Sequence, residues 1–386
     1  MENYKSFFIK ISLVFITLFL ALNCAAFGKS SITGNTSFWW TMYEQNENGV
    51  LQTGTYEKAA DVASGFNLKQ ARLTFEHNNR PFDAKIQTRF EEKVAILDCY
   101  VSWQPSKCFQ LYAGQMKIPT TYEALTADDK LDFISRSNIS KNIADWSLSR
   151  PPYFSPFYGN RSDYRDIGVG VKGKVGSGSC PDLVSYFLMA SNGLGANLSI
   201  GGKESKEYIL SNDVGDYFYG MRLDVSPIKL LKFGGHYSKN KHDNILYNDG
   251  KTVLDLDRYS WSTDLSLILP FAKFTTMYAK GEVNDDYFHA ALTNLRYSGW
   301  EAKLLFVMIK DKIQLGLRYD RYTESYFGEG TPTKQNDITF GCNFIPASNV
   351  RLQLNYVIKN TDSEAKVDSD DNILFLNFQY NFSITN

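Results

Sequence analysis

Apolar and polar residues alternate with a period of two along much of the sequence, most clearly near the carboxyl end. Between Asn372 and Phe382, one side of the pattern holds Leu374, Leu376, Phe378, Tyr380 and Phe382, and the other holds Asn377, Gln379 and Asn381. This period is that of a β-strand with one apolar face. The stretch is about as long as a tilted strand needs to cross a bilayer, and its aromatic residues gather toward one end. One such strand would also fit the edge of a soluble β-sandwich, so the rest of the chain has to decide.

The alternation recurs after the first thirty positions and predicts sixteen strands. The first eight are 32–43, 70–76, 83–91, 95–103, 108–117, 166–175, 183–191 and 216–225. The last eight are 229–238, 257–267, 271–280, 296–307, 312–321, 336–344, 349–359 and 372–382. An even number allows the last strand to pair with the first, Ile32 to Tyr43, and to close a ring. The residues that follow Phe382, from Ser383 to Asn386, are expected to be a small overhang.

The connections between these strands fall into two kinds. After each even-numbered strand the link is a few residues rich in Pro, Gly, Asn or Ser, such as 104–106 and 346–348. After most odd-numbered strands it is long and polar: 44–65, 118–165, 192–215, 240–256, 281–295, 322–335 and 360–371. A soluble sandwich has no reason to sort its connections in this way. The pattern predicts an all-β fold, a transmembrane antiparallel β-barrel of sixteen strands with turns on the periplasmic side and loops outside.

The first 28 residues have the features of a secretory signal peptide. Lys5 and Lys10 precede an apolar stretch from Ile11 to Leu22, and small residues follow at Ala25 and Ala26. Cys24 raises the alternative of a lipoprotein signal, but Asn23 stands where that signal wants a small residue. We therefore expect residues 1–28 to be removed and residues 29–386 to form the barrel. No run of about twenty apolar residues occurs later, which argues against a helical membrane protein.

Composition agrees with strands and turns. The chain has 386 residues, of which 24 are Tyr and 27 are Gly, and its formal net charge is −1. This balance gives no sign of a nucleic-acid partner. Of the five cysteines, the four after the leader are scattered and form no metal-ligand spacing and no disulfide framework. We predict neither cofactor nor metal, and buried or lipid-facing cysteines.

Several short motifs resemble the phosphate-selective porin O and P family. They are Gln70–Leu73, Gly114–Pro119, Glu123–Thr126, Phe133–Ser137, Arg165–Val169, Asn192–Gly193, Leu317–Arg321, Gly341–Asn343 and Val350–Tyr356. Each is weak alone, but they keep their order over nearly the whole chain. The resemblance implies an outer-membrane porin of sixteen strands, usually a homotrimer, whose long third loop folds into the lumen as the constriction. Here that loop is 118–165.

The sequence departs from the family pattern between Ser137 and Arg165. This part is longer than expected and carries Trp146, Tyr153, Phe154, Phe157 and Tyr158 among three prolines. These aromatic residues either fix the loop to the wall or form a slide for a ring-bearing solute. From Gly114 to Gly168 seven basic residues balance seven acidic ones, which puts phosphate selectivity in doubt. The charges are partly sorted: Glu123, Asp128, Asp129 and Asp132 come early, and Arg136, Lys141, Arg150, Arg161 and Arg165 come late.

The inward side of the predicted strands carries more basic than acidic residues. The basic ones are Arg72, Lys85, Arg89, Lys172, Lys174, Arg222, Lys232, Lys273, Lys303, Arg318, Arg351 and Lys359. The acidic ones are Glu76, Glu91, Asp98, Asp224, Asp264, Glu301 and Asp320. A positive excess inside a narrow tube favours anions, and arginine can meet phosphate or carboxylate oxygens with two hydrogen bonds. Any single one of these residues is as well explained as a wall charge paired with a neighbour.

The predicted pore-lining residues therefore fall into two groups. In or beside the loop they are Lys117, Arg136, Lys141, Arg150, Arg161 and Arg165, and on the wall they are Arg72, Arg89, Arg222, Arg318 and Arg351. The uncharged polar face of the closing strand leaves selectivity to other parts of the wall and to the loop.

Catalysis has little support, because the four histidines have no recognisable nucleophile arrangement around them. The expected function is passive diffusion of small hydrophilic solutes, anionic or neutral, across the outer membrane of a Gram-negative cell. A modest anion preference is expected, with phosphate as one candidate, and lipid and two sister subunits are the expected partners. The alternatives are a channel for another solute, an outer-membrane hydrolase and an adhesive barrel.

Overall fold

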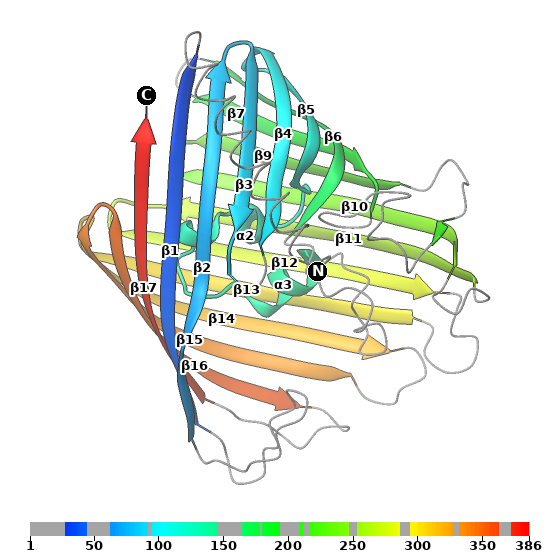
Figure 1. The fold of residues 1–386 in the computed structure, drawn as a ribbon. Coiled ribbons are helices and arrows are strands. Elements are labelled where there is room, and N and C mark those ends of the chain that lie inside the picture. Colours follow the sequence, from blue (N-terminus) through cyan, green and yellow to red (C-terminus); the bar gives the residue numbers. More distant parts are fainter. Residues whose placement is uncertain are drawn as a thin grey trace, which may run out of the picture.

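The protein is a closed antiparallel β-barrel (Figure 1). The computed structural model describes residues 28–44, 62–91, 94–144, 164–177, 180–193, 209–210, 217–246, 253–285, 294–326, 332–362 and 372–385. Sixteen long strands form the wall, and the ring closes because β1 pairs with both β2 and β17. The predicted fold class and strand number are confirmed.

The first wall strands in chain order are β1 (Lys29–Glu44), β2 (Val62–Asn79), β3 (Phe82–Arg89), β4 (Ala95–Ser106), β5 (Phe109–Lys117), β6 (Arg165–Ser177), β7 (Cys180–Ser191) and β9 (Phe218–Ile228). The others are β10 (Leu231–Leu246), β11 (Val253–Ile268), β12 (Ala272–Asp285), β13 (Asn294–Ile309), β14 (Ile313–Tyr326), β15 (Thr333–Ala347), β16 (Val350–Asp362) and β17 (Asn372–Thr385). The two-residue strand β8 (Ile209–Leu210) pairs with the end of β10, inside what was predicted to be a loop.

Most strands are longer than predicted at the end where the long loops begin. β2 starts at Val62 rather than Gln70, and β10 runs to Leu246 rather than Ser238. Near these ends both faces of a strand meet water, so the alternation that marks a membrane-crossing segment fades although the pairing continues. Short turns alternate with long connections, as the sequence predicted.

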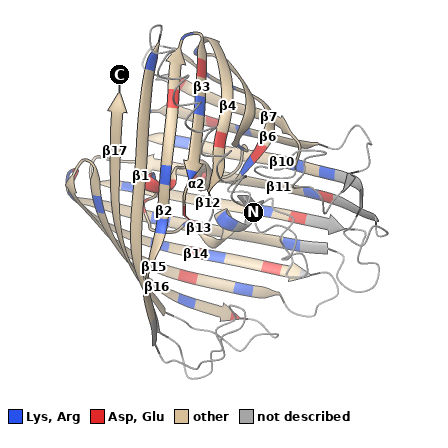
Figure 2. Cartoon of the chain, viewed as in Figure 1, with Lys and Arg blue, Asp and Glu red and all other residues tan. Residues whose placement is uncertain are grey.

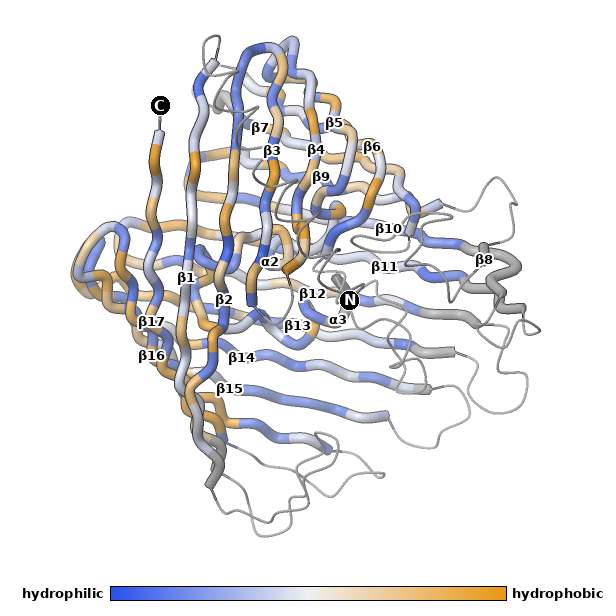
Figure 3. The backbone as a smooth tube through the Cα atoms, viewed as in Figure 1, coloured by the Kyte–Doolittle hydropathy of each residue, from blue (hydrophilic) through white to orange (hydrophobic). Residues whose placement is uncertain are grey.

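Hydrophilic and hydrophobic residues alternate along several wall strands (Figure 3), and the exposure of their side chains shows that the two faces of the wall differ. In β17 the outward Leu376 and Phe378 are 47% and 43% exposed, whereas Asn377 and Gln379 between them are 1% and 3% exposed. In β9 the outward Met221 is 52% exposed and the inward Arg222 3%. The apolar face thus points away from the barrel axis and the polar face lines the interior, which is the reverse of a soluble barrel.

The contact between the first and last strands explains one glycine and corrects one expectation. Gly34 lies opposite Phe382, and a Cβ on Gly34 would come 2.2 Å from the Phe382 ring, so the aromatic ring fills the space that glycine leaves. Thr385 pairs with Ser31, and Ile384 with Ile32. The residues after Phe382 therefore continue the strand and are not an overhang, because β1 begins early enough to pair with them.

The described part of the connection between β5 and β6 carries three short helices. They are α2 (Tyr122–Leu125), the 3₁₀ helix η1 (Asp128–Lys130) and α3 (Asn138–Ala144). No helix in the described part of the chain is long and apolar enough to cross a membrane. The predicted leader lies almost wholly outside the described residues, as does the second half of the long loop.

Candidate functional site

Residues 118–144, which we call the anchored segment, bind inward-facing side chains of many wall strands. Backbone groups from Thr120 to Asn138 meet side chains of β9 and of β14 to β17. The segment buries Phe133, Ile134 and Ile139 almost completely. Ile139 packs against Met277, Ala279, Tyr297 and Tyr322, and Ile134 against Val357, Ile373, Phe375 and Trp39. Apolar contacts and polar side chains together fix the path of this segment.

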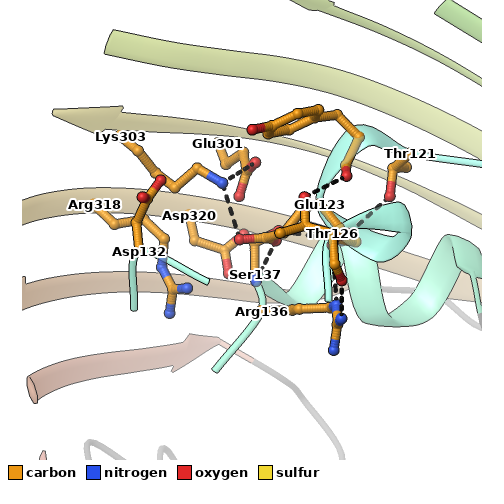
Figure 4. Close-up of polar contacts among 12 residues, drawn as sticks. Thr121, Glu123, Thr126, Asp132, Arg136, Ser137, Glu301, Lys303, Arg318 and Asp320 are labelled. Carbon is orange, nitrogen blue, oxygen red and sulfur yellow. Dashed lines mark hydrogen bonds and ion pairs between the residues drawn. The ribbon is translucent and has the colours of Figure 1, made fainter. Parts of the chain in front are cut away.

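A buried ion pair joins α2 to β13 (Figure 4). The Lys303 ammonium lies 2.9 Å from one carboxylate oxygen of Glu123 and 3.0 Å from Glu301. The other Glu123 oxygen accepts hydrogen bonds from the Ser137 backbone N–H and hydroxyl, both at 2.8 Å. Burial alone would raise the pKa of Glu123, but Lys303 and then Arg318 outweigh it and lower this pKa to about 2. Glu123 is therefore ionised at neutral pH, and it ties both ends of the segment to the wall.

A row of carboxylates lies at the start of α3 and accepts hydrogen bonds from its first residue. Glu301, Asp320 and Asp337 lie opposite one another on β13, β14 and β15. The Asn138 backbone N–H donates to Asp320 at 2.5 Å, and its side-chain amide donates to Asp337 at 2.8 Å. Carboxylates at the start of a helix satisfy its free N–H groups and complement its dipole. These wall charges are thereby committed to holding the segment.

Side-chain amides on the last three strands hold the middle of the segment. Asn343 donates to the Asp132 carbonyl at 3.0 Å, Gln379 donates to the Asp129 carbonyl at 3.1 Å, and Asn355 accepts from the Ile134 N–H at 2.7 Å. The Gln353 amide donates to the Asn343 side chain, and the Asn377 amide donates to the Gln353 side chain, each at 3.0 Å. The closing strand, whose uncharged face seemed to have no part in the site, thus helps to position it.

A second charged cluster surrounds Asp128 in η1. Its carboxylate pairs with Arg72 of β2 at 2.6 Å and with Arg136 of the segment itself. Burial raises the pKa of Asp128, but Arg72 and Arg136 lower it more strongly, so the net pKa is far below its usual range. Arg136 also donates to the carbonyls of Glu123 and Thr126 at 3.1 and 2.6 Å. Lys117 donates to three carbonyls at the end of α2, Ala124, Leu125 and Thr126, at 2.9 to 3.2 Å.

Beside the anchored segment lies a cavity of about 910 Å³. It reaches from Leu125, Ala127 and Asp129 in the segment to Gln104, Lys107 and Ser348 near the short turns. Its basic lining residues are Arg72, Lys85, Lys107, Lys117, Lys130, Arg165, Lys172, Lys174 and Arg222. Its acidic ones are Glu76, Asp98, Asp129 and Asp224. Nine cations and four carboxylates line this cavity, and three of the cations, Arg72, Lys174 and Arg222, pair with carboxylates that do not line it, Asp128, Asp182 and Asp264. Figure 2 shows how charges are spread along the strands.

Five of these cations have carboxylate partners among the described residues, and four do not. Arg165 pairs with Asp98 at 2.5 Å, Arg222 with Asp264 at 2.8 Å, and Lys85 with Glu76 at 3.2 Å. Lys107, Lys130 and Lys172 form no ion pair with any residue that the structure describes. Lys172 instead lies 4.4 and 4.2 Å from the ring centres of Tyr112 and Phe187. Lys117, which also lacks an ion pair, is bonded to backbone carbonyls, so Lys107, Lys130 and Lys172 are the three lining cations whose ammonium groups have no oxygen partner among the described residues.

The predicted pore-lining residues occupy different places. Arg72, Lys117, Arg165 and Arg222 line the cavity. Arg318 and Arg351 donate to the carbonyls of Ser135 and Asp129 at 2.6 and 3.4 Å, as Arg136 does within the segment. Arg89 is buried at the end of β3, and Lys141 is exposed on α3. Arg150 and Arg161 lie outside the described residues.

Sequence reasoning missed Lys69, Lys107 and Lys130. Lys69 is the extra residue of a β-bulge, because Ser37 pairs with Gln70 while the next residue, Phe38, pairs with Leu68. The bulge turns Lys69 toward the Ile134 carbonyl, to which it donates, and toward the Trp39 ring. Strict alternation cannot anticipate a bulge. Lys107 lies in a turn, outside the strand positions counted for the wall. Lys130 lies among the acidic residues early in the loop, whereas the predicted basic residues of the loop follow them.

Solved structures of similar fold include a porin and an outer membrane channel. An anion-selective porin from Comamonas acidovorans aligns with a TM-score of 0.64 at 11% identity, over 92% of this chain and 100% of that chain. The outer membrane channel DcaP of Acinetobacter baumannii aligns with a TM-score of 0.59 at 12% identity, over 92% of this chain and 98% of that chain. OmpF of Salmonella typhi, solved with daunomycin, aligns with a TM-score of 0.59 at 11% identity and the same coverage. At such identities the likeness establishes the fold alone.

No curated protein matches the sequence significantly. The sequence profile of one family, described as phosphate-selective porin O and P, matches residues 41–165 and 275–382. The matched ranges make up more than half of the chain and include the anchored segment and the closing strand. The protein therefore belongs to the phosphate-selective porin O and P family.

Proposed function

We propose that the protein is a passive, water-filled channel for small hydrophilic solutes with a modest preference for anions. As a porin of this family it lies in the outer membrane of a Gram-negative cell. The observation that carries the anion preference is the cavity wall, where nine basic residues face four acidic ones. A surplus of one sign in a narrow tube between low-dielectric walls concentrates the opposite ion.

Two further features belong to the proposal. The loop 118–165 acts as the constriction, because its anchored segment borders the cavity and is bonded to inward-facing side chains on several strands. The barrels assemble as trimers after removal of residues 1–28, as the family resemblance implies. One solved structure of similar fold, OmpT of Vibrio cholerae, is described as a trimer form.

Phosphate selectivity is a finer proposal on the same cavity. Lys107, Lys130 and Lys172 are free of carboxylate partners among the described residues, so a phosphate need not displace one to bind them. An arginine in the cavity such as Arg222 is by contrast saturated by Asp224 and Asp264. We therefore assign anion binding to lysines rather than to the arginines favoured by the sequence.

Reversal potentials in planar bilayers under a salt gradient test the channel and its sign. We expect an anion-selective reversal potential with potassium chloride, and a cation-selective one or the absence of conductance contradicts the proposal. Phosphate added well below the chloride concentration should reduce the chloride current if the site prefers phosphate. An unchanged chloride current would contradict phosphate selectivity and would favour a general anion channel or a channel for another solute. We propose no catalytic activity, and lipase or protease turnover by the purified barrel would contradict this.

A further inference from the structure

Outward basic residues gather near the ends of β10 to β15 that lead into the long loops. Six stand there among the described residues: Lys239, Lys241, Lys280, Arg296, Arg321 and Lys334. Lys239 and Lys280 each follow an outward tyrosine by two residues, Tyr237 and Tyr278, both 42% exposed. Residues two apart in a strand share a face, so these cations point away from the lumen.

Strand register brings three of them together into what we call the basic patch, Lys280, Arg296 and Arg321. Lys280 lies opposite Ser298, and Arg296 is two residues further along the same strand. Arg321 lies opposite Trp300, which is two residues from Ser298 on the other side. Lys280 thus lies directly beside Ser298, and Arg321 lies diagonally across from it on the other neighbouring strand. The Cα atoms of Lys280 and Arg321 are two strand spacings and two residues apart, roughly 12 Å, which two long side chains can bridge around one phosphate.

The patch has a positive surplus. Arg296 pairs with Glu282 at 3.2 Å, and the same carboxylate accepts the Tyr259 hydroxyl at 2.7 Å. Lys280 and Arg321 form no ion pair within the part of the chain that the structure describes. Glu282 is therefore already satisfied, and two cations remain for a ligand from outside the chain.

Aromatic pairs border the patch on the side of the bilayer. Trp261 and Tyr278 have ring centres 5.5 Å apart, and those of Trp300 and Tyr319 are 4.8 Å apart. Beyond them toward the short turns the outward face becomes aliphatic, with Leu315 and Leu317 both more than 40% exposed. Aromatic rings mark the interface between hydrocarbon and headgroups in outer-membrane barrels. The basic patch therefore stands at the level of the lipid headgroups on the loop side.

The opposite part of the wall has no such patch among the residues described. Outward positions near the loop ends of β17, β1 and β2 are held by apolar residues such as Leu374, Met42 and Phe66. Contacts between protein copies are depleted in lysine at their centre. The charged outer surface of β10 to β15 is therefore better suited to contact lipid than to contact a second barrel. The apolar outer surface of β17, β1 and β2 shows no such preference.

We propose that the basic patch binds the phosphoryl headgroup of a lipid in the outer leaflet, with its acyl chains against Tyr278 and Trp300. Lys280 and Arg321 bind the phosphate oxygens, and Ser298 and Thr323 lie beneath them as a polar floor. The proposal requires the membrane orientation of a porin but is independent of what passes through the lumen.

Energy transfer from tryptophan to a lipid probe tests it. The mature barrel is placed in phosphatidylcholine vesicles with rising fractions of phosphatidic acid carrying a pyrene-labelled acyl chain. Trp261 and Trp300 border the patch and act as donors. We expect K280Q/R321Q to raise the probe fraction needed for half-maximal transfer on the order of tenfold at low salt. A matched control, K310Q/K312Q, removes the same charge from the turn of the same hairpin, where both lysines are exposed, and should behave as the unaltered protein.

Two further readouts keep the outcomes separate. Single-channel conductance should be the same in all variants, since none of the four altered side chains faces the lumen. The variant K280R/R321K, which keeps both charges, should show the same transfer as the unaltered protein. Equal transfer curves for the two double variants overturn the proposal. So does a loss of oligomer on cross-linking in K280Q/R321Q with unaltered transfer, which would make the patch a contact between subunits.

Discussion

Lysines and arginines of the interior differ in what they are bonded to, and this difference decides what each substitution should do. Arg72 and Arg222 neutralise carboxylates, and Arg318 holds a loop carbonyl. Lys130 is exposed on η1, and Lys172 rests on aromatic rings. The first group maintains structure and contributes little to the electrostatic field of the cavity, because each of its guanidinium groups is bonded to a carboxylate or a backbone carbonyl. The second group contributes uncompensated charge to the cavity.

The variant K130Q/K172Q should therefore weaken anion selectivity without loosening the loop. We expect the chloride-to-potassium permeability ratio to fall roughly twofold, because two of the surplus charges are removed from a focusing cavity. The reversal potential in a salt gradient measures this. K174Q is a matched control, since Lys174 lines the same cavity but is exposed and paired with an exposed Asp182. An equal shift in the control would show that pairing has no bearing on selectivity.

Replacement of Lys303 should loosen the anchored segment, unlike replacement of Lys130 and Lys172. Replacing it by Met leaves Glu123 and Glu301 buried without their shared cation, which costs about 3 to 5 kcal/mol in comparable buried pairs. We expect K303M to release the anchored segment, seen as trypsin cleavage after Lys141 that the unaltered protein resists. The double variant E123Q/K303M removes one of the stranded charges and should regain part of that resistance. Identical cleavage of K303M and the unaltered protein would mean that the apolar contacts suffice.

At the scale of elements, the anchored segment is held by three kinds of contact that respond to different conditions. The apolar contacts of Ile134 and Ile139 do not depend on pH, and the amides of β15 to β17 are neutral. The carboxylates of Glu123 and Asp128 are charged anchors whose pKa values are lowered by their partners. Acidification therefore removes only the carboxylate contacts and leaves the apolar and amide contacts in place.

Acidification should loosen the segment over a defined range. Because the pKa of Glu123 falls from its model-compound value of 4.5 to about 2, its stabilisation is complete above pH 4.5 and is lost as the pH falls toward 2. We expect the open-channel current to become noisier over this interval as the segment begins to move. The variant E123Q should show more noise already at neutral pH and a smaller change on acidification. A current that is equally steady from pH 7 to pH 2 in both proteins would contradict this role of Glu123.

At the scale of the whole molecule, the barrel could be predicted from sequence and much of its interior could not. Sixteen strands and their pairing follow from alternation, since each residue of a wall strand must face either lipid or lumen. The contacts of the anchored segment have no such local signal. That Gln379 holds a loop carbonyl 250 residues away depends on the path of that loop, and so does the hydrogen bond from Arg318 to a loop carbonyl. The bulge at Lys69 breaks the alternation that sequence reasoning relies on.

The anion preference, as a property of the whole lumen, should depend on salt in a way that a binding site would not. Uncompensated lysines act on passing ions over about 10 Å at 0.1 M ionic strength, but over about 3 Å at 1 M. The described cavity is wide enough, at about 910 Å³, for screening ions to enter it. We therefore expect the permeability ratio to approach unity as potassium chloride rises from 0.1 to 1 M, measured from reversal potentials at a constant gradient ratio. Block of the current by phosphate at fixed ionic strength isolates direct coordination, because it competes with chloride at the lysines themselves. A ratio that stays constant up to 1 M would place selectivity in close contacts at Lys130 and Lys172 and not in the field of the wall.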